Sequence, residues 1–150
     1  EFNWWFDPEA AKIVVRAPWK EQIVVGLDVC EKVICTYDMY QDLVKMLGNS
    51  EQATLLRKTT GKRFEERGPS YKRYVWDVIV SAIIIDPSII TEERTCYIDV
   101  NADFGPSYGQ SLAYTRQKPI GTQEARIIME IDQDKFWKLM LDKIYWKSAQ

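Results

Sequence analysis

The pattern of apolar and polar positions predicts five helices, several of them from apolar residues that recur every three or four positions, the spacing of amphipathic helices. The first segment follows Asp7 and Pro8, which suit a helix N-cap and a first turn, and it ends before Pro18. The others cover residues 37–47, 50–66, 71–85 and 134–146. Residues 71–85 are apolar nearly all round and predict a helix inserted in a core, whereas residues 134–146 carry one apolar stripe and predict a surface helix that docks on a sheet.

Four shorter runs are rich in β-branched and aromatic residues and predict strands, at residues 22–27, 95–100, 110–115 and 125–131. The run 22–27 is compact and bounded by charged residues, which is compatible with a buried strand of the parallel type. We expect the runs 110–115 and 125–131 to pair as a hairpin, and residues 1–3 to be extended. The pattern predicts an α/β fold, with an open, mostly parallel or mixed sheet flanked by helices, in a single domain of residues 1–150.

The composition, 46% hydrophobic and 28% charged with a net charge of −2, is that of an ordinary globular protein. Basic residues are spread between acids, which argues against a nucleic-acid polymer as partner. The longest apolar stretch, residues 78–85, is far shorter than the roughly 20 residues that span a bilayer. The start of the chain lacks the residue order of a signal peptide. These patterns favour a cytoplasmic location without a membrane partner.

The chain has three cysteines and no histidine. Cys30, Cys35 and Cys96 lack C-x-x-C spacing, so free thiols are favoured over a disulfide or a metal site. Without histidine, the chain cannot build a Ser-His-Asp triad, a Cys-His pair, an H-E-x-x-H zinc site or an imidazole general acid. The glycine-containing residues 105–109 predict a turn between strands better than a phosphate-binding loop.

Two pairs of residues carry the candidate chemistry. Glu1 and Asn3 lie two apart on the expected extended segment, so a carboxylate and an amide would face one ligand such as a sugar diol. The alternative is a loop whose polar groups satisfy the backbone. Asp77 begins an apolar run, where its carboxylate would interact with the helix N-terminus or with a calcium ion. Trp76 beside it is either a core residue or a platform for a ligand ring.

Short motifs follow one another in a fixed order from the start of the chain to its end. They are Glu1-Phe2-Asn3, Asp7-Pro8-Glu9-Ala10-Ala11, Val25-Gly26-Leu27-Asp28-Val29, Trp76-Asp77, Ile85-Asp86-Pro87-Ser88, Tyr97-Ile98-Asp99-Val100, Gly109-Gln110 and Ile131-Asp132-Gln133-Asp134-Lys135-Phe136-Trp137. Each motif is weak alone. In this order and spacing they resemble the inosine-uridine type nucleoside hydrolases over nearly the whole chain.

The resemblance implies an α/β fold and hydrolysis of the N-glycosidic bond of ribonucleosides, with a calcium-bound water and a catalytic aspartate. By position, Glu1 and Asn3 match residues that bind the ribose hydroxyls, and Asp77 matches a carboxylate that contacts both calcium and ribose. Many members carry a histidine where Trp76 stands. The tryptophan is similar to the purine-preferring branch, in which it stacks on the base. The resemblance thus implies an N-ribosyl hydrolase of the purine nucleosidase type, active in purine salvage, whose partner is a purine nucleoside.

One departure from the family concerns the metal site. The family's aspartate-rich calcium motif belongs to its N-terminal half, and no such cluster, with its catalytic-base aspartate, occurs in this sequence. The resemblance therefore implies the C-terminal portion of a larger domain, inactive by itself, that forms a homo-oligomer or associates with the missing half. The alternative is a non-catalytic nucleoside-binding, sugar-binding or assembly module derived from the same fold.

Overall fold

The computed structural model of the chain describes residues 2–144, which form two compact units. Among these residues, unit 1 comprises 2–29 and 90–131, and unit 2 comprises 30–89 and 132–144. The expectation of a single domain over residues 1–150 stays a prediction. Within residues 2–144, no helix has the length and apolar character needed to cross a membrane.

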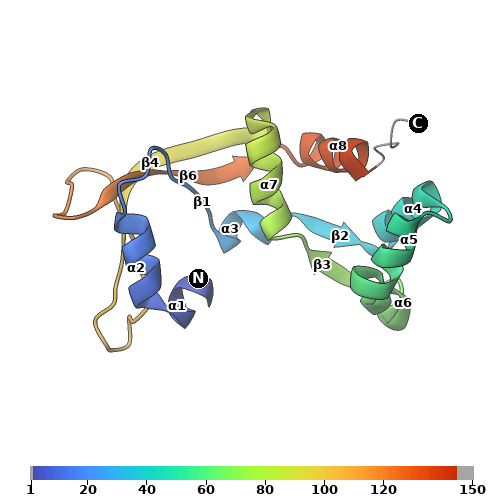
Figure 1. The fold of residues 1–150 in the computed structure, drawn as a ribbon, viewed down its shortest axis with the longest axis horizontal. Helices are drawn as coiled ribbons and strands as arrows, with labels where there is room; N and C mark the ends of the chain where they lie inside the picture. The colour runs from blue at the N-terminus through green and yellow to red at the C-terminus, as the bar shows by residue number, and fades with distance from the viewer. Residues whose placement is uncertain (1, 145–150) are drawn as a thin grey trace. The chain divides into compact units, whose positions relative to one another are not determined.

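Unit 1 contains a four-stranded mixed sheet (Figure 1). Its strands are β1 (Ile23–Val25), β4 (Ile90–Val100), β5 (Ser111–Tyr114) and β6 (Gln123–Ile131), in the spatial order β1-β6-β4-β5. β1 is parallel to β6, and β4 is antiparallel to both β6 and β5. The predicted α/β class with a mixed sheet is confirmed, and the run 22–27 does contain a parallel strand.

The expected hairpin between residues 110–115 and 125–131 is wrong, because β4 lies between these two strands. β4 begins at Ile90, well before the expected start at Thr95, and spans 11 residues. Its Tyr97 lies opposite Tyr114 of β5 on one edge and opposite Glu124 of β6 on the other. Because β4 lies between β5 and β6, its backbone groups form hydrogen bonds on both edges. If β5 and β6 paired directly with each other, β4 could not have both of them as partners.

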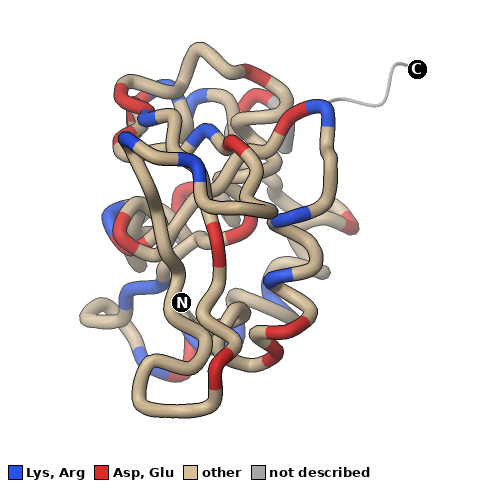
Figure 2. The backbone as a smooth tube through the Cα atoms, turned by 90° about the vertical axis from the view of Figure 1, so that its left-hand side faces the viewer, with Lys and Arg blue, Asp and Glu red and all other residues tan. Residues whose placement is uncertain are grey.

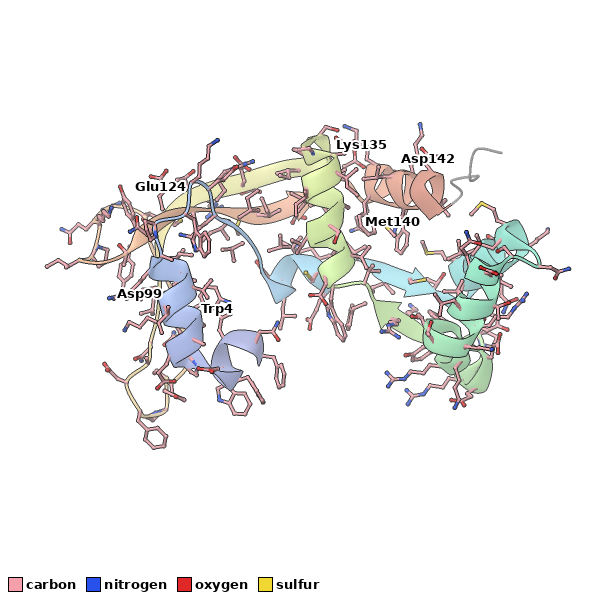
Figure 3. The ribbon with its side chains drawn as sticks, viewed as in Figure 1. Trp4, Asp99, Glu124, Lys135, Met140 and Asp142 are labelled. Carbon is pink, nitrogen blue, oxygen red and sulfur yellow. The ribbon has the colours of Figure 1, made fainter. Side chains whose placement is uncertain are left out.

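Two helices of unit 1, α1 (Phe2–Phe6) and α2 (Pro8–Arg16), precede the sheet, and α2 packs against β4. The predicted N-cap is confirmed, since the Asp7 carboxylate accepts a hydrogen bond from Ala10 N–H at 2.9 Å. A short helix, α3 (Leu27–Cys30), follows β1. One hydrophobic cluster of buried residues in this unit consists of Val15, Ile98, Val100 and Ala125. Trp4 of α1 packs against this cluster and is labelled in Figure 3.

Unit 2 is mostly helical and contains one small antiparallel sheet of β2 (Ile34–Thr36) and β3 (Lys72–Tyr74) (Figure 1). Its helices are α4 (Tyr37–Leu47), α5 (Glu51–Leu56), the π-helical turn η1 (Arg57–Gly61), α6 (Lys62–Arg67), α7 (Asp77–Ile85), the 3-10 turn η2 (Pro87–Ile89) and α8 (Gln133–Ile144). The predicted boundaries of residues 37–47 and the start at Ser50 are confirmed. The Thr36 and Ser50 hydroxyls accept hydrogen bonds from the first turns of α4 and α5.

The expected helix over residues 71–85 begins only at Asp77, because residues 72–74 form β3. β3 pairs with β2, a strand of three residues that the apolar pattern did not reveal. The expectation of a helix buried all round is also wrong. Ile79, Ala82 and Ile83 of α7 are buried, whereas Ile84 and Ile85 are exposed.

The last helix, α8, contacts α7 and the η2 turn within unit 2. Phe136, from the predicted apolar stripe, is fully buried, and Trp137 lies edge-on to it with ring centroids 5.0 Å apart. The side chains of Ile144 and Tyr145, which belong to the same predicted stripe, lie outside the described ones. Lys135, Met140 and Asp142 mark the course of α8 in Figure 3.

Acidic and basic positions are interspersed along the backbone, as Figure 2 shows. Several of these residues form ion pairs. The Arg126 guanidinium of β6 donates hydrogen bonds to Glu93 of β4 and to Glu21, and the shortest nitrogen–oxygen distance is 2.6 Å in each case. The two carboxylates raise the pKa of Arg126 above its ordinary value. These pairs link the sheet of unit 1 across its surface.

Candidate functional site

Trp76 and Asp77 lie at the start of α7, so the expected position of Asp77 at a helix N-terminus is confirmed although the helix does not begin at residue 71. Asp77 is the first residue of the helix, and its side chain is exposed. Trp76 has φ +42° and ψ −111°, the one positive φ among the non-glycine residues of the described chain. A residue with a side chain pays about 1–3 kcal/mol for such a conformation, so its surroundings must hold it in place.

Two donors hold the Trp76 carbonyl group. The Ile79 N–H donates to it at 3.0 Å, and the buried Cys30 thiol donates at 3.9 Å. The indole remains 44% exposed and is therefore available to a ligand. It lies beside the ring of Tyr74, the last residue of β3, with ring centroids 6.0 Å apart and planes inclined by 34°.

The opening residues differ from the extended segment that the sequence predicts. Phe2 and Asn3 lie within α1, so the extended conformation expected for them is wrong. Glu1 lies outside the described residues. Asn3 has an exposed side chain and belongs to unit 1, whereas Asp77 belongs to unit 2. Their assignment as ribose ligands stays a prediction.

The titratable groups of the described chain give a limited choice of metal ligands. Between residues 2 and 144, no group of three or more His, Cys, Asp or Glu side chains is placed to hold a metal ion. Calcium takes six to eight oxygen ligands, and the assignment of Asp77 as one of them stays a prediction. Cys30, Cys35 and Cys96 are not joined in disulfide bonds within the described residues, and burial raises the pKa of the Cys35 thiol, with a smaller opposing effect of Arg73.

An ion pair that the sequence analysis missed joins α2 to β4 in unit 1. Arg16 Nε donates to Asp99 Oδ1 at 2.9 Å, and Arg16 Nη2 donates to Asp99 Oδ2 at 2.6 Å. Asp99 is only 6% exposed and also accepts a hydrogen bond from Val100 N–H at 2.9 Å. The guanidinium holds the pKa of Asp99 below its ordinary value, against the opposing effect of burial. The pair therefore joins the C-terminal end of α2 to the sheet.

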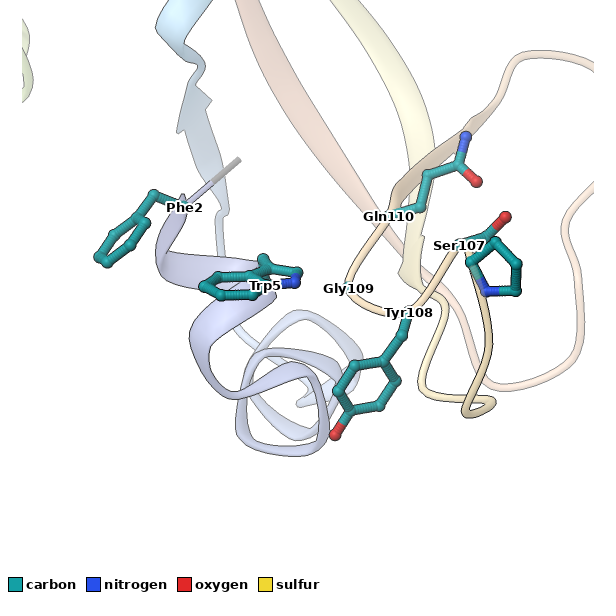
Figure 4. Close-up of a pocket in the computed structure, with 7 residues that line it drawn as sticks. Phe2, Trp5, Ser107, Tyr108, Gly109 and Gln110 are labelled. Carbon is teal, nitrogen blue, oxygen red and sulfur yellow. The ribbon is translucent and has the colours of Figure 1, made fainter.

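The loop between β4 and β5 packs against α1 and α2, and residues 105–109 form the predicted turn. Tyr108 donates a hydrogen bond to Glu9 of α2 at 2.6 Å. Gly109 has φ +84°, and a Cβ at this position would lie 2.6 Å from the Cα of Trp5. The loop and α1 together line an open pocket of about 680 Å³ (Figure 4). Its lining residues are Phe2, Trp5, Pro106, Ser107, Tyr108, Gly109 and Gln110.

The motifs and the fold agree with one protein family. The sequence model described as inosine-uridine preferring nucleoside hydrolase matches residues 1–138. The chain is 32% identical over 149 residues to the inosine-uridine preferring nucleoside hydrolase of Leishmania major, covering 96% of this chain and 45% of that protein. It is 28% identical over 145 residues to a pyrimidine-specific ribonucleoside hydrolase of Escherichia coli, covering 93% of this chain and 44% of that protein.

The fold has solved counterparts as well. An inosine-guanosine nucleoside hydrolase superposes with a TM-score of 0.83 at 20% sequence identity, over 99% of this chain and 47% of that chain. This likeness concerns the fold. The chain thus spans about half the length of the relatives it matches. With a family match that extends over residues 1–138, the chain belongs to the inosine-uridine preferring nucleoside hydrolase family.

Proposed function

We propose that this chain is part of an enzyme that hydrolyses the N-glycosidic bond of ribonucleosides, with a preference for purine nucleosides. Family membership supports the reaction. The relatives differ in the bases their names specify, from inosine and uridine to pyrimidines and to inosine and guanosine. The preference for purines rests on a single observation: an exposed indole, that of Trp76, is held by an unusual backbone conformation directly before Asp77.

The absence of histidine from the chain shapes this proposal. A positioned general acid accelerates a reaction by about 10²–10⁴-fold, equivalent to about 3–5.5 kcal/mol of barrier. Stacking of a base on an aromatic ring contributes about 1–3 kcal/mol, of which only the part that grows toward the transition state assists catalysis. Trp76 would therefore act together with a proton delivered to the purine from solvent. A pyrimidine, with a single ring, would gain less from the indole.

Asp77 is proposed to contact the ribose, with Asn3 and Glu1 as further ribose ligands, and to contribute one oxygen ligand to calcium. Calcium would supply a bound water as the nucleophile when present. The described residues do not by themselves complete such a site, so the other ligands and the catalytic-base aspartate would come from the remainder of a longer protein. The 150-residue chain alone is expected not to turn over nucleosides.

The surface of unit 1 supports association with further protein. Phe2, Trp5 and Phe6 of α1 are exposed, and the ring centroid of Phe2 lies 6.1 Å from that of Trp5 and 6.0 Å from that of Phe6. β1 lies at one edge of the sheet and is parallel to its neighbour β6. Parallel strands are usually covered by further structure, and an edge strand has backbone groups that another strand can pair with. A second copy or the remainder of the fold would cover this surface.

The test compares kcat/KM for inosine and uridine in the full-length protein and in its Trp76→His variant. We expect the parent to prefer inosine, and the variant to shift the ratio toward uridine because histidine can protonate either base. Trp19→His is the matched control, since Trp19 is an exposed indole of unit 1 and should leave the ratio unchanged. Faster hydrolysis of uridine than of inosine by the parent would contradict the purine preference. Binding of inosine without turnover would favour the non-catalytic alternative.

A further inference from the structure

Tyr74 and Trp76 form a pair of exposed rings on the surface of unit 2. Tyr74 is 39% exposed and Trp76 is 44% exposed, although their ring centroids are only 6.0 Å apart. Tyr40 and Phe64, another close aromatic pair of this unit, are almost completely buried and stacked at 4.9 Å. The Tyr74–Trp76 pair is therefore not a core contact. Its open faces are available to a flat ligand.

Each ring is anchored by a different element. Tyr74 ends β3 and lies opposite Ile34 of β2 in the antiparallel ladder. Trp76 is placed by its positive φ and by the hydrogen bonds that its carbonyl group accepts from Ile79 N–H and from the Cys30 thiol. The backbone of both residues is therefore held before a ligand arrives, which lowers the conformational entropy that binding costs.

The combined area of the Tyr74 and Trp76 rings suits a purine base better than a pyrimidine base. A bicyclic purine that stacks on the indole extends beyond one ring and can reach a neighbouring ring, whereas a monocyclic pyrimidine covers less area. Resting on the proposed function, we infer that Tyr74 is a specificity-determining residue: together with Trp76 it forms a two-ring surface that recognises the bicyclic base of purine nucleosides. Aromatic stacking prefers offset or inclined rings, as in this pair, and every base has a face on which to stack.

The experiment measures kcat and KM of the full-length protein for inosine and uridine in Tyr74→Ala and Tyr74→Phe variants. We expect Tyr74→Ala to raise KM for inosine about 3- to 10-fold and KM for uridine less than about 2-fold, the effect of losing one aromatic contact. The Tyr74→Phe variant keeps the ring and should remain near the parent. Phe104→Ala is the matched control, because Phe104 is an exposed ring on the β4–β5 loop of unit 1. Equal effects of Tyr74→Ala on both nucleosides, or no effect on either, would overturn the inference.

A binding measurement separates this inference from the proposed function. Titration calorimetry with hypoxanthine and uracil needs no turnover. If the parent does not hydrolyse nucleosides but binds hypoxanthine about 3- to 10-fold more tightly than Tyr74→Ala does, the proposed function fails and the two-ring surface stands. If hydrolysis proceeds and Trp76→Ala weakens hypoxanthine binding while Tyr74→Ala does not, the proposed function stands and the role of Tyr74 is refuted. No binding of hypoxanthine to the parent would overturn the two-ring surface as well.

Discussion

Removal of the Arg16 guanidinium is expected to destabilise the chain strongly, because it leaves the Asp99 carboxylate buried without its ion-pair partner. Loss of one partner of a fully buried pair costs about 3–5 kcal/mol. Arg16 has a side chain that is 34% exposed, whereas that of Asp99 is 9% exposed, so solvent screens part of the interaction. We therefore expect Arg16→Met to lower the free energy of unfolding by about 2–3 kcal/mol.

Two further variants make this prediction specific. The double variant Arg16→Met/Asp99→Leu removes both charges and should recover most of the loss, because the neighbouring strand residues are apolar. Arg94→Met is the matched control. Arg94 pairs with Glu92 at 3.2 Å on the surface, where the side chains are 64% and 49% exposed, and its loss should cost less than about 1 kcal/mol.

The pH dependence gives a second check on the same pair. Arg16 lowers the pKa of Asp99 in the folded protein, so the pair contributes stability above the unfolded pKa of about 3.9 and loses it as pH falls through the folded pKa. In Arg16→Met the unpaired carboxylate should have a raised pKa and take up a proton on mild acidification. The difference between parent and variant should therefore shrink from pH 7 to pH 4. Urea unfolding followed by circular dichroism measures the free energy of unfolding of each protein. The reasoning would be refuted if Arg16→Met lost no more stability than Arg94→Met, or if its loss did not depend on pH.

Three other perturbations test separate contacts. Gly109→Ala should destabilise the chain by more than about 1 kcal/mol, because its φ is +84° and the new Cβ would lie 2.6 Å from the Cα of Trp5. Gly105→Ala is the control, because a Cβ at Gly105 would enter open space. An equal fall in melting temperature in the two variants would contradict this prediction. Tyr40→Phe should cost about 0.5–1.5 kcal/mol by removing a hydrogen bond to a carboxylate of α6. Since burial and this hydrogen bond raise the pKa of Tyr40 to about 12, the parent should lose stability between pH 10 and 12 in a way that the variant does not. Phe6→Ser should weaken the proposed self-association in sedimentation analysis, because Phe6 is an exposed ring of α1, and unchanged association would exclude α1 from the interface.

The helices that the sequence predicted well are those whose ends are marked by local chemistry. Asp7, Thr36 and Ser50 each accept a hydrogen bond from the following first turn, and Gly48 ends α4 with φ +58°. These signals act within a few residues and can be seen in the sequence alone. β2 and β3 have three residues each, too few to show a period, and they exist because they pair with one another. The position of β4 between β5 and β6 is likewise a property of long-range pairing.

In the candidate site, too, local features could be predicted from the sequence, whereas long-range contacts could not. The sequence placed Asp77 at a helix N-terminus, since an apolar run follows it directly, although it began the helix too early, at residue 71. It could not show that Tyr74 belongs to a strand that brings its ring beside Trp76. The buried pair was missed too, although one signal was present: Asp99 interrupts the apolar run of β4 between Ile98 and Val100. A charge in such a run requires a partner, and only the fold identifies Arg16 as that partner.

The conformation of Trp76 connects stability with function. Its φ of +42° is unfavourable for any residue with a Cβ, and its indole is too exposed to offset this cost by burial alone. A glycine at this position would relieve the strain, whereas an alanine would keep the strain and lose the ring. Comparison of Trp76→Gly with Trp76→Ala therefore separates the backbone cost from the contribution of the ring.

We expect Trp76→Gly to unfold with a free energy about 1 kcal/mol higher than Trp76→Ala, since relief of about 1–3 kcal/mol of strain exceeds the additional entropy of glycine in the unfolded chain. Both variants should lose the preference for inosine over uridine equally, because neither carries an aromatic ring. Urea unfolding and the two kcat/KM values measure the two effects on the same proteins. An alanine variant as stable as the glycine variant would show that the backbone is unstrained, and retention of the purine preference by either variant would remove Trp76 from base recognition.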